Sequence, residues 1–204
     1  MNYRVFFRSL LLLLLCATMA VSLVGCGKDE EPTLKEDVYV EFNIRDYGSF
    51  TLVLYANIAP ITVSNFAKLV GEGFYDGLTF HRIADLTGEG GYIIQGGDPK
   101  GDGTGSSPNK ITGEFSANGI ANDLSHKRGV ISMARSNDMN SASCQFFICA
   151  GDCSFLDGNY AAFGEVIEGM NVVDAIANVF VDYNNRPFYP IIIESAKIIE
   201  KPAQ

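Results

Sequence analysis

The 204-residue sequence contains no tryptophan and only two histidines, His81 and His126. Two histidines are too few for a convincing zinc site. The sequence also lacks His-Glu-x-x-His, Gly-x-Ser-x-Gly and Cys-x-x-Cys motifs, which excludes the usual templates of zinc hydrolases, serine hydrolases and dithiol oxidoreductases. The glycines of 101–105 do not have the spacing of a dinucleotide-binding or phosphate-binding loop. We therefore predict no cofactor and no metal.

Basic residues are also scarce, since 15 Lys and Arg stand against 24 Asp and Glu, for a net charge of −9. Arg4 and Arg8 lie within the first 25 residues, which contain no acid, so the remainder is more acidic still. An acidic body argues against nucleic acid as a partner. It argues equally against an anionic lipid surface as the main partner of the folded part.

The N-terminus reads as an export signal. A basic start is followed by the run Leu10–Leu15, and Leu23-Val24-Gly25-Cys26 resembles the bacterial lipobox. We predict a signal peptide over 1–25, a lipid on Cys26, a flexible tether over 26–37 and a folded domain over 38–204. The protein would then be extracytoplasmic and anchored to the bacterial cell membrane by that lipid alone. The alternative is an uncleaved anchor, although the 17-residue apolar span 9–25 is at the short limit for crossing a bilayer.

Three of the five cysteines remain after the predicted signal and lipid site are set aside: Cys144, Cys149 and Cys153. We expect them to be buried free thiols. A disulfide between Cys149 and Cys153 is the alternative, and a redox function would require one of them to have a low pKa.

Short apolar runs dominate the folded part. Alternation over 38–44 and a second run over 50–55 predict a hairpin with a turn at Gly48. Pro60 predicts the start of one helix, and 169–177 has helical spacing for a second. Further strands are predicted over 79–83, 92–97, 129–134, 145–150, 160–163 and 189–199. Many short strands and two helices favour a mainly β, closed or nearly closed antiparallel barrel.

Three polar side chains stand in these apolar runs, namely Arg82, Gln95 and Gln145. They would place fixed hydrogen-bond donors in an apolar pocket that has no nucleophile or general base. Such a pocket suits the binding of a neutral peptide or a reaction that only rotates a bond. For Arg82 taken alone, the competing interpretation is a surface side chain that extends to water from a strand end.

Six segments in order resemble the cyclophilins, which are peptidyl-prolyl cis-trans isomerases: Phe80–Ile83, Ile94–Asp98, Gly101–Gly105, Ser132–Arg135, Gln145–Ile148 and Phe155–Gly158 with Phe163-Gly164. The resemblance covers about residues 38–204, and this part of the chain looks like the bacterial form of the family. It implies a closed eight-stranded antiparallel barrel capped by two helices.

By this resemblance the catalytic residues are Arg82 and Gln95, with Arg82 acting on the prolyl bond and Gln95 holding both Arg82 and the substrate carbonyl. The implied substrate-binding residues are Tyr92, Ile93, Gly103, Ala134, Arg135, Gln145, Phe147, Phe155, Leu156 and Tyr160. Tyr92 stands where the family usually has Phe. Phe155 and Tyr160 stand where well-known eukaryotic members have Trp and His, which suggests weak cyclosporin binding. The loop 84–91 is longer than usual and would lie beside the active face.

The implied function is acceleration of Xaa-Pro isomerisation during the folding of exported proteins. The partners would be their proline-containing polypeptides, and we expect a monomer. The alternative is a proline-peptide binding module or chaperone with little catalytic turnover.

Overall fold

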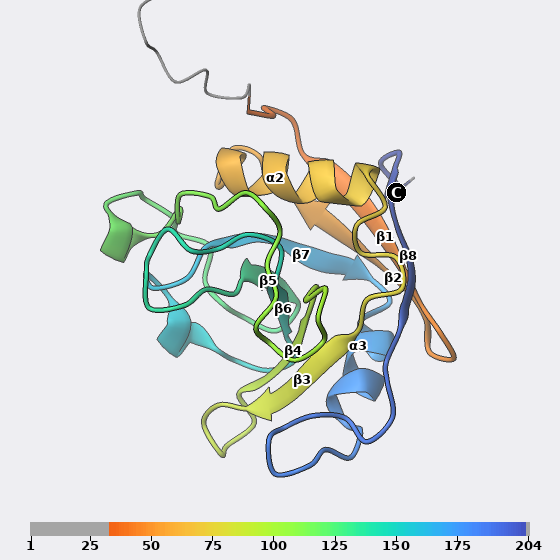
Figure 1. Cartoon of the computed structure of the whole chain (residues 1–204). Helices are drawn as coiled ribbons and strands as arrows, with labels where there is room; N and C mark the ends of the chain where they lie inside the picture. The colour runs from red at the N-terminus through yellow and green to blue at the C-terminus, as the bar shows by residue number, and fades with distance from the viewer. Residues whose placement is uncertain (1–32, 203–204) are drawn as a thin grey trace, which may run out of the picture. The chain divides into compact units, whose positions relative to one another are not determined.

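Eight antiparallel strands form one curled sheet in the computed structural model, which describes residues 33–202 (Figure 1). The predicted signal peptide 1–25, Cys26 and most of the tether lie outside the described residues. The strands are β1 (Val38–Ile44), β2 (Gly48–Leu54), β3 (Phe80–Asp85), β4 (Tyr92–Gly96), β5 (Val130–Met133), β6 (Phe146–Cys149), β7 (Ala162–Glu168) and β8 (Ile193–Ile199). Their order across the sheet is β3-β4-β6-β5-β7-β2-β1-β8.

The predicted hairpin is confirmed by β1 and β2, which pair in register from Val38 with Leu54 to Ile44 with Gly48. Gly48 has a φ of +100°, a left-handed conformation that glycine adopts without strain. Alternate residues of β1 are buried, and the rings of Phe42 and Phe50 stack with centroids 5.2 Å apart.

The two predicted helices are confirmed as α2 (Pro60–Gly71) and α3 (Met170–Ala177), which lie at opposite ends of the sheet (Figure 1). Pro60 opens α2, as expected from its fixed φ and missing N–H group. The residue before it, Ala59, has no side chain that could cap the helix. The carboxylate of Glu114 caps the helix instead, since it accepts hydrogen bonds from the backbone N–H groups of Ile61 (3.1 Å) and Thr62 (2.8 Å).

The closed barrel is not confirmed. The two edges of the sheet are β3 and β8, and within residues 33–202 they are joined by an isolated bridge between Thr79 and Ile192 rather than by a ladder. The backbone N–H of Phe80 donates to Ile191 (3.0 Å) beside that bridge. The sheet is therefore an open half-barrel, with an aromatic core inside it that includes Phe42, Phe50, Phe66, Tyr75, Phe80, Phe146 and Phe163.

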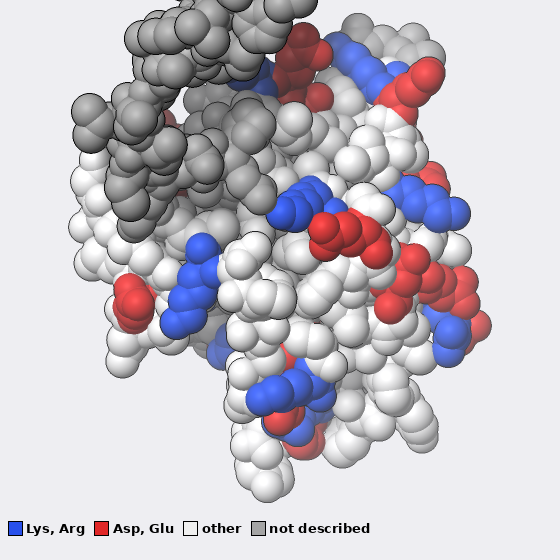
Figure 2. All heavy atoms as spheres, turned by 45° about the horizontal axis from the view of Figure 1, so that its top comes forward, with Lys and Arg blue, Asp and Glu red and all other residues white. Residues whose placement is uncertain are grey.

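Acidic and basic side chains alternate in small groups on the face shown in Figure 2, and no broad basic patch is seen among its described residues. The helices described between residues 33 and 202 include none with the length and apolar character needed to span a membrane.

Candidate active site

A β-bulge sets the direction of Arg82. The strands β3 and β4 pair Phe80 with Gly96 and Arg82 with Gln95, so His81 is an extra residue in β3. Without it, alternation would put Arg82 on the same face as Phe80, which is buried in the core. The extra residue turns Arg82 onto the face that carries Gln95, whereas Ile83 returns to the core.

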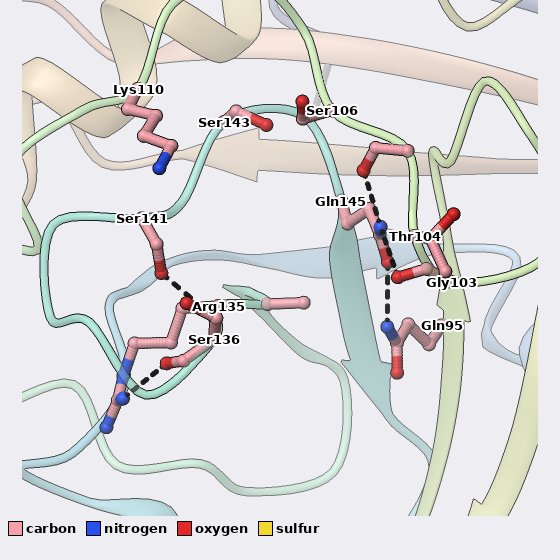
Figure 3. A pocket seen from close by; sticks show the side chains of 12 residues that line it. Gln95, Gly103, Thr104, Ser106, Lys110, Arg135, Ser136, Ser141, Ser143 and Gln145 are labelled. Carbon is pink, nitrogen blue, oxygen red and sulfur yellow. Dashed lines mark hydrogen bonds between the residues drawn. The ribbon is translucent and has the colours of Figure 1, made fainter.

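A chain of hydrogen bonds then holds the guanidinium group. Arg82 donates from Nη1 to Oε1 of Gln95 (3.1 Å), and Nε2 of Gln95 donates to Oε1 of Gln145 (3.0 Å). The amide of Gln145 donates in turn to the backbone carbonyls of Gly103 (3.1 Å) and Gly105 (2.9 Å) (Figure 3). Each amide is oriented by the next, so Arg82 has a fixed position, and the remaining donors of its guanidinium group have no partner among residues 33–202.

The loop at the end of this series of hydrogen bonds, which contains Gly103 and Gly105, is organised by Asp98, which is buried. Its carboxylate accepts hydrogen bonds from the backbone N–H groups of Lys100 (2.9 Å), Asp102 (3.0 Å) and Gly103. A Cβ atom at Gly105 would lie 1.9 Å from Oδ1 of Asp98, so glycine is needed here for close approach. The irregular loop predicted for this glycine-rich stretch is confirmed, and no group of three metal-ligating side chains occurs within residues 33–202.

An apolar cluster lies next to Gln95 on the same face of β4. It consists of Ala84, Ile93, Phe147, Cys149, Cys153 and Leu156, with Leu86, Ala134 and Tyr160 packed against it. Phe147 is its centre, because its ring stacks on His126 at 5.9 Å and meets the edge of Tyr160 at 5.8 Å. The fixed cation and the apolar cluster are thus neighbours, as the sequence predicted.

His126 is held from both sides. Its Nδ1 lies 2.8 Å from Asp157 Oδ1, and its Nε2 lies 2.9 Å from the hydroxyl of Ser132. Burial lowers the pKa of His126, although the hydrogen bond to Asp157 opposes the shift. Ser132 and His126 are buried, so the imidazole supports the ring of Phe147 from inside the protein, whereas Asp157 is exposed.

Comparisons with known proteins decide the family. The model of the cyclophilin type peptidyl-prolyl cis-trans isomerase family matches residues 39–198. The chain belongs to the cyclophilin family. It is 40% identical over 163 residues to peptidyl-prolyl cis-trans isomerase A of Dickeya dadantii, covering 76% of this chain and 81% of that protein. It is also 40% identical over 166 residues to peptidyl-prolyl cis-trans isomerase-like 1 of Neurospora crassa, covering 81% and 95%.

Solved cyclophilin structures agree with the fold. The crystal structure of a Cryptosporidium parvum cyclophilin matches with a TM-score of 0.72 at 29% identity, covering 82% of this chain and 100% of that one. A structure of the same protein in the presence of the dipeptide Ala-Pro matches with a TM-score of 0.71. The predicted cyclophilin resemblance and the isomerase function are therefore confirmed.

Seven of the ten predicted substrate-binding residues fall into two groups in this cyclophilin. Ile93, Phe147 and Leu156 form the apolar cluster, with Ala134 and Tyr160 against it. Tyr92 and Phe155 are not part of it, and are 41% and 51% exposed. Strand alternation places Tyr92 on the face of β4 opposite to Ile93 and Gln95. The roles of Tyr92 and Phe155 in binding remain predictions.

Arg135 has a structural task that the sequence did not suggest. Its guanidinium group donates to the backbone carbonyls of Asn159 (3.0 and 2.8 Å) and Ser136 (2.9 Å). It also lies over the rings of Phe115 and Tyr160, at 5.1 and 4.7 Å from their centroids. Its side chain therefore braces the loops around the cavity that Ala134 and Arg135 line.

Two cavities flank the Arg82–Gln95 pair. One, of about 380 Å³, is lined by the predicted residues Gln95, Gly103, Ala134, Arg135 and Gln145 and by Lys110, Ser106, Ser136, Ser141 and Ser143 (Figure 3). The other, of about 450 Å³, is lined by His81, Arg82, Gln95, Asp102, Gly103, Asn184 and Arg186. Asn184 and Arg186 were missed by sequence reasoning, because they lie about 100 residues from Arg82 in a loop without an apolar pattern.

All three described cysteines are free and buried, as predicted. Cys149 and Cys153 share a hydrogen bond within the apolar cluster, and this bond together with burial raises the pKa of Cys149 well above its ordinary value. The same hydrogen bond stabilises the thiolate of Cys153 and so lowers the pKa of that thiol. Both side chains are shielded from solvent, so a redox function is not favoured by their accessibility.

Proposed function

We propose that Arg82 is the catalytic residue of this cyclophilin and that Gln95 positions it. The observation that carries the proposal is the hydrogen bond from Arg82 Nη1 to Gln95 Oε1, which fixes a permanent cation beside an apolar cluster. In this arrangement the proline ring of a substrate packs against Ile93, Phe147 and Leu156. The guanidinium group then faces the imide bond that joins the proline to its preceding residue.

Isomerisation of an Xaa-Pro bond requires rotation about a bond with partial double-bond character, at a barrier of about 20 kcal/mol. In the twisted state the prolyl nitrogen becomes pyramidal and its lone pair is localised. A donor of Arg82 that points at this nitrogen interacts more strongly with the twisted state than with either planar state. This difference lowers the barrier without a covalent step, through a charge that is oriented in advance.

The remaining predicted residues would hold the peptide along the groove. Gln145 and Gly103 are linked by a hydrogen bond and line the cavity of about 380 Å³ together with Ala134 and Arg135. Backbone groups of this wall can pair with an extended substrate. Tyr160 would close the apolar pocket, and Phe155 would contribute from its rim, whereas the role predicted for Tyr92 is not supported by its place on the opposite face of β4.

The test is exchange NMR on a short Xaa-Pro peptide with the purified chain. We expect Arg82→Ala to lose the catalysed exchange while thermal unfolding changes little. Arg45→Ala is the matched control, because Arg45 is also paired, with Glu194 at 3.0 Å, but lies on the exposed β1–β2 turn. An unchanged rate of catalysed exchange with Arg82→Ala would refute the assignment of Arg82 as the catalytic residue. Line broadening of a bound peptide without catalysed exchange in the wild type would favour the binding-module alternative.

We also propose that the protein is an extracytoplasmic lipoprotein that assists the folding of exported proteins as a monomer. The support is the sequence alone: a basic start, the run Leu10–Leu15 and the lipobox-like Leu23–Cys26. Mass spectrometry of the mature protein should find a diacylglycerol on Cys26, and Cys26→Ser should release the protein from membranes. Mature chains that begin upstream of Cys26 would contradict the proposal.

A further inference from the structure

The segment between α3 and β8 exposes a group of aromatic side chains. Phe180, Tyr183, Phe188 and Tyr189 are 87%, 94%, 65% and 84% exposed, and we call these four residues the aromatic patch. Large apolar side chains are normally buried, and single exposed ones need no explanation. Four within ten residues are a concentrated apolar surface of the kind that marks an interaction site.

The backbone beneath the patch is ordered. Val181 and Pro187 form an antiparallel bridge, and the N–H of Phe188 donates to the carbonyl of Phe180 (3.2 Å). The carboxylate of Asp182 accepts hydrogen bonds from the N–H groups of residues 184 (2.8 Å) and 186 (2.9 Å) and so closes the turn. The rings are therefore presented by a fixed hairpin, which reduces the entropy lost when something packs against them.

Three of the four patch side chains, all except Tyr183, line a hollow of about 590 Å³. Its lining consists of Tyr47, Val179, Phe180, Pro187, Phe188 and Tyr189, and includes no charged side chain. A hollow of this chemistry takes apolar side chains rather than charged or strongly hydrated groups.

The same hairpin forms a wall of the proposed substrate groove. Its tip contributes Asn184 and Arg186 to the cavity that contains Arg82, and Nη2 of Arg186 donates to the carbonyl of Asp102 (3.1 Å). The backbone N–H of Ile83 on β3 donates to the carbonyl of Asn185 (2.9 Å), which holds the hairpin against the catalytic strand. The hairpin that carries the patch therefore also lines the cavity beside Arg82.

The hairpin that carries the patch lies far from the first described residues of the domain. In Figure 1 the hairpin, in blue, lies at the lower end of the domain, while residues 33–37 enter at the upper end beside α2. There the N–H of Leu34 donates to the hydroxyl of Ser64 (2.7 Å).

We propose that the aromatic patch binds an apolar segment of the same unfolded polypeptide whose proline occupies the groove. This inference rests on the proposed function, since it takes the groove beside Arg82 as the substrate site. An extended chain spans about 3.3 Å per residue, so a client protein can reach both sites while a peptide of four residues occupies the groove alone. Binding at the second site raises the local concentration of prolines near Arg82.

The experiment compares two substrates with the full chain and the variant Phe180→Ser/Phe188→Ser/Tyr189→Ser. For a tetrapeptide with one Xaa-Pro bond, we expect kcat/KM to be unchanged. For an unfolded protein whose refolding is limited by proline isomerisation, we expect kcat/KM to fall at least about five-fold, mainly through KM. Ile167→Ser/Ile198→Ser is the matched control, because these side chains are 41% and 52% exposed on β7 and β8.

Several outcomes would overturn the inference. These are an equal loss with both substrates, no loss with the unfolded protein, or an equal loss in the control variant. A dimer that dissociates in the variant would assign the patch to a second copy of this chain, and binding to anionic vesicles lost in the variant would assign it to a membrane. If the triple variant does not fold, the single variant Phe180→Ser serves the same comparison. Failure of the proposed function would differ, since it would abolish tetrapeptide catalysis in the wild type.

Discussion

The substitution Gln95→Glu tests the hydrogen-bond chain that holds Arg82. The new carboxylate keeps an acceptor for Arg82 but cannot donate to Oε1 of Gln145, which lies 3.0 Å from Nε2 of Gln95. Two acceptors would then face each other, so the amide of Gln145 must turn over. Once turned, Gln145 presents its oxygen instead of its nitrogen to the carbonyls of Gly103 and Gly105.

The structure allows the losses of stability and of activity in Gln95→Glu to be calculated approximately. The turned amide forfeits two hydrogen bonds, each worth about 0.5–1.5 kcal/mol, so the free energy of unfolding should fall by about 1–3 kcal/mol. Catalysis should fall as well, because a carboxylate paired with Arg82 weakens the positive potential that acts on the prolyl nitrogen. A loss of about 10- to 100-fold in kcat/KM corresponds to about 1.4–2.8 kcal/mol of transition-state stabilisation.

Urea unfolding and exchange NMR on one Xaa-Pro peptide measure the two effects. Asn118→Asp is the matched control, since Nδ2 of Asn118 also donates two hydrogen bonds, to the Gly113 carbonyl (2.7 Å) and to Oδ1 of Asn140 (2.9 Å). The control should lose stability without a comparable loss of activity. If Gln95→Glu retained wild-type kcat/KM, the idea that Gln95 orients a free cation at Arg82 would be refuted.

Burial lowers the pKa of both His81 and His126 below 6.5, so the unfolded state takes up protons first on acidification. The free energy of unfolding should keep its full value above pH 6.5 and should fall below that pH by up to about 1.4 kcal/mol per pH unit for each histidine. A series of urea midpoints can check this, and a flat profile down to pH 5 would contradict it. Glu114→Leu leaves the first N–H groups of α2 and the hydroxyl of Thr62 without their acceptor, and chemical denaturation should show a loss of about 2–4 kcal/mol. Gly97→Ala combines a φ of +81° with a Cβ atom 2.7 Å from the Cys144 carbonyl, whereas Gly119→Ala has a φ of +80° and open space; calorimetry should find Gly97→Ala lower in Tm, and equal values would argue against the contact.

Local pattern was sufficient for most elements of the fold. The alternation over 38–44 matches the bounds of β1, and Pro60 marks the first residue of α2. The prediction for β7 was too short, because Gly164 and Glu165 interrupt its apolar run. The strand continues through them by pairing with β2, and a Cβ atom at Gly164 would lie 2.2 Å from the Val53 carbonyl. Packing against β2 therefore requires glycine at position 164. An argument from strand propensity instead interprets this glycine as the end of the strand.

The site was predictable only where chemistry and strand pattern coincide. Arg82 and Gln95 could be singled out because polar side chains are unexpected in apolar runs, and the structure places them opposite each other. The bulge at His81 that brings them to one face has no signature in a single sequence. The same limit applies to Asp98, whose carboxylate serves backbone N–H groups. Its position after two glycines suggests a turn but does not reveal that task.

The pairing of β1 with β8 has a consequence for how the domain folds. Tyr39 near the start of the domain pairs with Ile199 near its end, so the first and last strands are neighbours in the sheet. Contacts of such high sequence separation close a long loop and form late, at an entropic cost that nearby contacts do not carry. A nascent chain therefore holds β1 without one of its two neighbours until its final strand is made. Completion of the sheet is delayed until the end of the chain has been synthesised.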